Sequence, residues 1–160
     1  MRRIYSSILE RLQPLVKSET LRWIDWDTGQ LKKVGANDRP PVAWPCALIR
    51  IGIPQTKDIT DKVQECRASV TITLAFDPLS QGSTAANAPE EVREEALTSY
   101  DVISKVYEML QGFGTKDFDC LVRRSQGEVS HNSLFVYQIV FDCRFVDRTA
   151  QNNSICESCR

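Results

Sequence analysis

Two pairs of aspartates, each with one residue between its members, are the first candidates for chemistry: Asp25 with Asp27, and Asp117 with Asp119. On a strand, residues two apart point to the same face, so each pair could offer two carboxylates to Mg²⁺. Both pairs lie beside expected turns or strand ends, where aspartate is common because its side chain bonds nearby backbone groups. We therefore expect structural roles, and we keep a metal-dependent enzyme using Asp25 and Asp27 as a minor alternative.

The histidine and glycine signals for catalysis or nucleotide binding are weak. His131, the single histidine, stands in an expected hairpin turn, where a solvated surface role is commoner than that of a base beside a nucleophile. Gly112 and Gly114 follow an expected helix, whereas the dinucleotide-binding glycines follow a strand and open a helix. These two glycines are therefore expected to end the helix. The sequence predicts no enzyme activity and no cofactor.

The cysteines divide into a pair near the end of the sequence and four within the expected strands. Cys156 and Cys159 form a C-x-x-C pair, but no second pair completes the four ligands that zinc prefers, and no strand-to-helix context marks a redox motif. We expect free thiols in a flexible segment over 149–160. The other four cysteines are expected to be small buried hydrophobic residues; these are Cys46, Cys66, Cys120 and Cys143.

The overall composition is that of an ordinary globular domain, with 160 residues, 42% hydrophobic residues and a net charge of −1. Its basic pairs are scattered and balanced by acids, so we expect no sequence-specific nucleic-acid binding. No apolar run approaches the ~20 residues that span a bilayer. The first residues resemble a signal peptide, but Glu10 and Arg11 interrupt the apolar stretch. We expect no membrane partner and a protein that stays in the cytoplasm where it is made.

Apolar periodicity and turn residues predict the elements that would position these side chains. Their expected order is a helix over 3–16, two short strands within 21–34, a loop over 35–44, a strand over 45–53, a loop over 54–65, a strand over 66–76, a loop over 77–89, a helix over 89–111, and strands over 118–124 and 133–147.

Each expected helix has one apolar stripe, and Pro14 is expected to kink or end the first helix. The first stripe is Ile4, Ile8, Leu12 and Leu15, and the second is Val92, Ala96, Tyr100, Ile103, Tyr107 and Leu110. The strands over 66–76 and 133–147 each carry one purely apolar face, which the helices can cover. The sequence thus predicts an α+β fold in which a single antiparallel sheet has both helices on one face, in one domain over 1–148.

The second face of the two long strands is too polar for a core and too apolar for plain solvent. Gln138, Asp142 and Arg144 alternate there with Leu134, Val136, Val140 and Val146. Such a mixed face suits pairing with copies of the chain, or the lining of a pore. The candidate interface is made of six residues: Arg67, Thr71, Thr73, Gln138, Asp142 and Arg144.

The order and pattern of four segments resemble a known family. These segments are PVAWPCALIRIG (41–52), TITLAF (71–76), LTSYDVISKVYEMLQGFG (97–114) and YQIVFDCRFVD (137–147). Over roughly 3–148, the chain resembles the tail terminator, or tail completion, proteins of long-tailed bacteriophages and prophages, to which neck and minor tail proteins are similar.

The resemblance implies a homohexameric ring that caps the tail tube at full length, stops polymerisation and offers a surface for head attachment. It also implies two partners, a tail tube protein and a head-completion or neck protein. The implied location is the virion, after assembly in the cytoplasm of the bacterial host. No catalytic residue is implied, and the ring and tube contacts would fall on the long loops and the second sheet face. A different possibility is a small-ligand or peptide-binding domain with a pocket near Trp23, Trp26 and Trp44.

Overall fold

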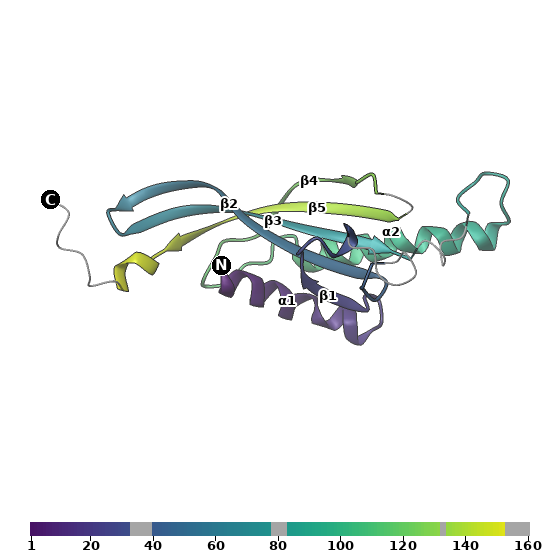
Figure 1. Ribbon diagram of the computed structural model, residues 1–160, viewed down its shortest axis with the longest axis horizontal. Helices are drawn as coiled ribbons and strands as arrows, with labels where there is room; N and C mark the ends of the chain where they lie inside the picture. The colour runs from purple at the N-terminus through teal and green to yellow at the C-terminus, as the bar shows by residue number, and fades with distance from the viewer. Residues whose placement is uncertain (33–39, 78–82, 132–133, 153–160) are drawn as a thin grey trace.

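A computed structural model describes residues 1–32, 40–77, 83–131 and 134–152 (Figure 1). The elements are α1 (Arg2–Lys17), β1 (Trp23–Trp26), the 3-10 helix η1 (Gln30–Lys32), β2 (Cys46–Thr60), β3 (Val63–Phe76), α2 (Glu90–Leu110), β4 (Val122–Glu128), β5 (Phe135–Asp147) and the 3-10 helix η2 (Thr149–Asn152). Within these residues, no helix is both long and apolar enough to cross a membrane.

The five strands form one sheet in the order β1-β2-β3-β5-β4. Three neighbouring pairs are antiparallel, and β1 pairs with β2 in parallel. The predicted α+β class is confirmed, but the sheet is mixed instead of wholly antiparallel. β1 ends at Trp26, and β2 starts at Cys46, which lies opposite Trp23. The chain therefore returns to the start of β1 before it enters β2, as a parallel pair requires.

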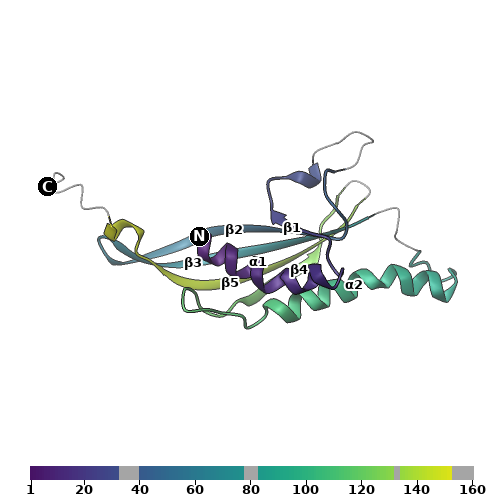
Figure 2. The same ribbon diagram turned by 90° about the horizontal axis from the view of Figure 1, so that it is seen from below.

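Both helices cover the same face of the sheet, as predicted (Figure 2). The core beneath them joins the predicted stripe of α1 to the apolar alternates of β3 and β5, including Val70, Ile72, Ile139 and Phe141. Pro14 does not end α1, which continues to Lys17. The sheet, with two helices on one side, therefore leaves its other side turned away from them. We call that side the open face.

The buried stripe of α2 differs slightly from the predicted one. Val106 and Ser99 are buried, whereas Tyr100 is exposed. The ring of Tyr100 instead lies 5.8 Å from that of Phe135, and its hydroxyl donates to Glu128 at 2.8 Å.

The polar segment over 54–65, expected to be a loop, is strand and tight turn. β2 runs to Thr60 and β3 starts at Val63, so the hairpin continues well beyond the helices (Figures 1 and 2). The residues of β2 from Gly52 onward are all exposed, so this part of the strand has no apolar face to reveal it in the sequence. We call residues 52–65 the arm.

Two exposed edges of the sheet are irregular, namely the part of β2 that extends beyond β1, and β4. In β2 the pairing shifts between Gly52 and Gln55, and in β4 it shifts between Arg123 and Ser125. β4 begins at Val122 and runs through Glu128, so the strand expected over 118–124 is displaced toward the C-terminus. Its first part is instead a loop closed by a bridge between Thr115 and Phe118.

A second, smaller core lies at one end of the open face. Its buried members are Leu31, Cys46, Leu48, Ala75 and Val136, with Trp23, Val42, Trp44 and Leu134 packed against them. Two of the apolar residues expected to make the second face a contact surface, Leu134 and Val136, therefore pack against the protein's own chain. The remaining open face extends from Thr73 and Gln138 toward the arm.

Three of the four cysteines expected to be buried are buried: Cys46, Cys66 and Cys143. Cys120 is exposed, so that expectation is wrong, because this residue precedes β4 and lies in the loop. Burial raises the pKa of the Cys46 thiol to about 12 and that of Cys143 to about 11. Cys156 and Cys159 lie outside the described residues.

Candidate functional site

The strand register brings the six predicted interface residues onto adjacent rows of the open face. Arg67 pairs with Arg144, Thr71 with Val140, and Thr73 with Gln138 across β3 and β5. Each of them has at least one sequence neighbour in the main core under the helices. Because successive residues of a strand point to opposite faces, the six side chains start from the side away from α1 and α2.

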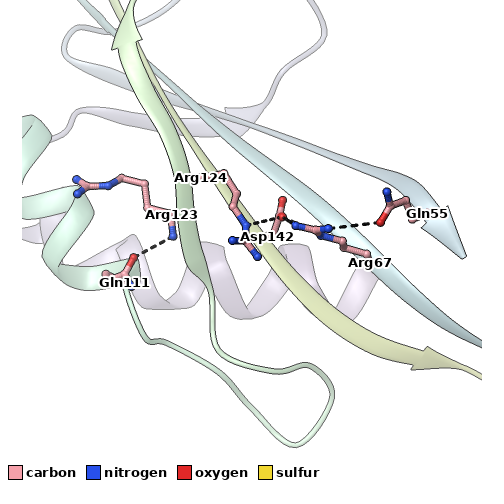
Figure 3. A network of polar contacts seen from close by, with 6 residues as sticks. All are labelled: Gln55, Arg67, Gln111, Arg123, Arg124 and Asp142. Atoms are coloured by element: carbon pink, nitrogen blue, oxygen red, sulfur yellow. Dashed lines mark hydrogen bonds and ion pairs between the residues drawn. The ribbon is translucent and has the colours of Figure 1, made fainter.

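Asp142 is the centre of a polar network on this face (Figure 3). Its Oδ2 accepts hydrogen bonds from Nε and Nη2 of Arg67, the first at 2.8 Å, and from Nε of Arg124 at 2.7 Å. The Asp142 side chain is only 14% exposed. Hydrogen bonds between ionised groups are among the stronger ones in proteins, and they strengthen further away from water. The network therefore fixes three strands, β3, β5 and β4, to one carboxylate.

Arg124 was not among the predicted residues, and the β-bulge in β4 explains why it belongs with them. Arg123 pairs with Phe141 and Ser125 with the next residue, Val140, so Arg124 is the extra residue. The guanidinium of Arg123 lies over the ring of Tyr107 at 4.0 Å, on the helix side. The bulge therefore lets the following arginine turn to the open face. In the sequence, only the two adjacent arginines in an edge strand could have indicated this bulge.

The other predicted residues differ in how much they present to a partner. Nε2 of Gln138 donates to Oγ1 of Thr73 at 3.0 Å, and Thr73 is itself buried. Arg144 has a side chain that is 69% exposed, with Glu65 at 3.9 Å. Thr73 therefore positions Gln138, whereas Arg144 is available for contact.

A hollow of about 740 Å³ adjoins this network at the edge of the sheet. Arg67, Arg124 and Arg144 line it from the strands, and parts of the 112–120 segment line the other side. Gly114 lies in that segment because a Cβ there would come within 2.9 Å of the backbone nitrogen of Cys120. The preceding Gly112 has a φ of +75° after the end of α2, as expected for a helix-ending glycine.

Three of the four aspartates, Asp25, Asp27 and Asp117, have side-chain contacts of the structural kind expected for them. Asp25 accepts the backbone N–H of Trp26 at 2.7 Å, and Asp27 accepts that of Gly29 at 3.0 Å. Asp27 also pairs with Arg50 at 2.8 Å. Asp117 pairs with Arg3 at 2.7 Å. Across the part of the chain that the structure describes, no three His, Cys, Asp or Glu side chains are grouped as a metal site would need.

The tryptophans do not form one pocket. Trp23 and Trp44 pack in the small core on the open face. Trp26 is exposed on the helix side, where its ring lies 5.9 Å from that of Tyr5 beside a mostly apolar hollow of about 430 Å³. His131 is partly buried, and its Nδ1 has no hydrogen-bond partner among the described residues.

No protein-family model matches the sequence, and no curated protein matches it. Chains from solved structures are similar to it in fold. One of them belongs to the virion of a native gene transfer agent (GTA) particle. That chain is 13% identical in sequence and superposes with a TM-score of 0.49, and the match covers 88% of this chain and 92% of the other.

Proposed function

We propose that this protein is a structural component of a phage virion that forms a ring on the end of the tail tube. The ring, hexameric by the resemblance to tail terminators, ends tube polymerisation and offers a surface for head joining. The observation that carries the proposal is the open face. Its central charges are fixed by the Asp142 network, while Arg144 and one side of Arg124 stay exposed beside it.

A face of this kind suits docking better than chemistry. The carboxylate of Asp142 is already engaged by two guanidinium groups, so its hydrogen-bonding capacity serves the protein's own structure. The exposed arginines next to it keep free N–H donors, and arginine is enriched at protein interfaces because its planar group binds several acceptors at once. We propose that the protein acts through such contacts and without catalysis.

The proposed partners are those that a ring on the end of a tail tube would contact. Copies of the chain form the ring, the tail tube protein meets the open face, and a head-completion or neck protein binds the opposite end of the ring. The proposed location is the virion, after assembly in the host cytoplasm. The exposed arm extends away from the helices and would reach a neighbour before the rest of the domain does (Figure 1).

The hollow beside Tyr5 and Trp26 favours a second candidate function, the binding of a small apolar ligand or peptide. Aromatic walls around a mostly apolar hollow are common in such sites. A thermal-shift screen separates the two functions. Large increases in melting temperature with small apolar molecules, lost in Trp26→Ala, would favour ligand binding. A protein that only forms a ring should show no such increase.

The test of the main proposal is assembly, measured with and without the tail tube protein from the same genome. Sedimentation velocity and negative-stain microscopy should show closed rings, at high concentration or on the ends of tubes, because some rings form only on their template. Tubes grown with the protein should stop at a defined length. A chain that stays monomeric in both conditions and leaves tube length unchanged would overturn the proposal.

A further inference from the structure

A basic hollow lies at the start of α1, away from the open face. It measures about 440 Å³ and is lined by Arg2, Arg3, Ser6 and Ser7 of α1 together with Lys116 and Asp117. Arg3 is paired with Asp117. Arg2 and Lys116 are exposed, and neither forms an ion pair with a residue that the structure describes. The hollow therefore carries positive charge that the surrounding chain does not balance.

The placement of these charges is unfavourable for the isolated chain. A helix begins at its positive end, where acidic residues stabilise it and basic residues do the reverse. α1 has no acidic residue in its first turn, and its N-cap makes no side-chain hydrogen bond. Two arginines nevertheless stand there. A bound anionic group would relieve this repulsion and satisfy the first N–H groups of the helix.

A surface of opposite charge occupies the start of α2. Glu90, Glu91, Glu94 and Glu95 are all exposed, and none of them forms an ion pair within the described part of the chain. The first buried residue of the helix is Ala96. The first turns of α2 therefore project beyond the sheet, which Figures 1 and 2 show plainly. We call this surface the acidic end.

The two surfaces lie at opposite ends of the helix layer. α1 and α2 run in opposite directions beneath the sheet, so the start of α1 lies near the end of α2 (Figure 2). Within one molecule the basic hollow and the acidic end cannot meet. Between two molecules placed head to tail they can, and a contact between two different surfaces is the kind that closes into a ring.

We propose that the acidic end of α2 in one copy docks in the basic hollow of the next copy. This inference rests on the proposed ring function, and it assigns the contact between neighbours to the helix layer. The open face of the sheet is then left for the tube. The charges make association faster and selective for the head-to-tail arrangement, because two acidic ends or two basic hollows repel each other.

Zero-length carbodiimide coupling tests the contact on the unaltered protein, since it joins a lysine only to a carboxylate that touches it. Equal amounts of unlabelled and ¹⁵N-labelled protein are mixed, coupled and analysed by mass spectrometry. We expect mixed-isotope peptides joining Lys116 to Glu90, Glu91, Glu94 or Glu95. They should decrease as salt rises from about 0.05 M to about 0.5 M. Lys57, on the arm, is the internal control and should not couple to these glutamates.

Charge exchange supplies the second test. Arg2→Glu with Lys116→Glu, or Glu91→Lys with Glu94→Lys, should each weaken self-association about tenfold or more, and mixing the two variants should restore it. All four residues are exposed, and circular dichroism and the melting temperature show whether each variant is folded. Lys105→Glu with Lys17→Glu is the matched control, which changes charge by the same amount elsewhere on the helices.

The outcomes separate this contact from the ring itself. Rings that form while Lys116 couples elsewhere, or while both variants assemble normally, overturn the contact and leave the ring proposal standing. Absence of any Lys116 coupling between copies, both in solution and on tubes, also overturns it. A basic-hollow variant that loses tube or nucleic-acid binding but keeps full self-association overturns it in favour of a different occupant.

Discussion

Arg67 and Asp142 lie 75 residues apart in the sequence and are joined by hydrogen bonds from Nε and Nη2 to Oδ2. They are diagonal neighbours, because the residue directly opposite Arg67 is Arg144. The diagonal pairing turns the Arg67 guanidinium away from a like charge. The sequence pattern places Asp142 and Arg144 on the same face, but the structure gives them different roles. Asp142 holds the sheet together, and Arg144 faces outward.

Asp142→Asn should therefore lower the stability of the folded chain. The amide is neutral, so two guanidinium groups lose their counter-charge in a place where Asp142 is 14% exposed. We expect the free energy of unfolding to fall by about 1–3 kcal/mol. Urea denaturation measures this loss. Asp101→Asn, on the exposed side of α2, is the control and should change it little. Equal stability of the two variants would contradict a structural role for the network.

Arg144→Glu should affect assembly more than folding. The side chain is 69% exposed, and its distance of 3.9 Å from Glu65 makes that ion pair a weak one. We expect the free energy of unfolding to stay within about 0.5 kcal/mol of the original value. Ring formation on tubes, or arrest of tube growth, should be reduced. Lys105→Glu makes the same charge change on the helix layer and should assemble normally. Normal assembly of Arg144→Glu would remove the open face as the tube contact.

Gly114→Ala should destabilise the loop that borders the open face. The added Cβ would come within 2.9 Å of the Cys120 nitrogen, a backbone atom that cannot move aside alone. We expect a loss of about 1–3 kcal/mol, as for other overpacked positions. Gly127→Ala is the matched control, because a Cβ there meets nothing within 4 Å. Thermal unfolding of the two variants should separate clearly, and coincident curves would show that the loop yields easily.

The cysteines should differ in reactivity. Cys120 is exposed, whereas Cys46 and Cys143 are buried, with thiol pKa values raised to about 12 and about 11. Iodoacetamide at mild alkaline pH should therefore label the Cys120 peptide before the Cys46 and Cys143 peptides, because the thiolate is the reactive form. Peptide mapping by mass spectrometry follows the order, and early labelling of Cys46 would contradict its burial.

The same shifts predict how stability depends on pH. The folded chain holds the Cys46 proton more tightly than the unfolded chain, whose thiol has its ordinary pKa of 9.0. This contribution is complete below pH 9.0 and is lost as pH rises toward about 12. Urea denaturation across this range should show falling stability. Cys46→Ala should flatten part of that fall, and an unchanged slope would show that other groups govern it.

The main architecture could be predicted because its determinants are local. The stripe of α1 and the apolar alternates of β3 and β5 repeat with the period of their own element, so the helix-covered face of the sheet follows from the pattern. The open face could be predicted for the same reason, since the residues that remain must point the other way. Arg67, Gln138, Asp142 and Arg144 all fall on that face.

The features that could not be predicted depend on distant parts of the chain. The turn of Arg124 to the open face depends on a bulge, which the pairing with β5 determines. The burial of Val136 depends on Leu31, Val42 and Trp44, which lie outside its own strand and pack in the same small core. The β2 half of the arm, from Gly52 to Thr60, is exposed throughout and has no apolar alternation, so a period-based prediction took it for a loop.

The irregular edges of the sheet have a consequence for how chains can associate. A straight, regular edge with a full row of unpaired backbone N–H and C=O groups would let one sheet add to the next without limit and form fibres. Here the register breaks in both β2 and β4, and Pro54 lacks a backbone N–H at the outer edge of the arm. These irregularities disfavour the addition of one sheet edge to another. Contacts between chains are thereby left to side chains.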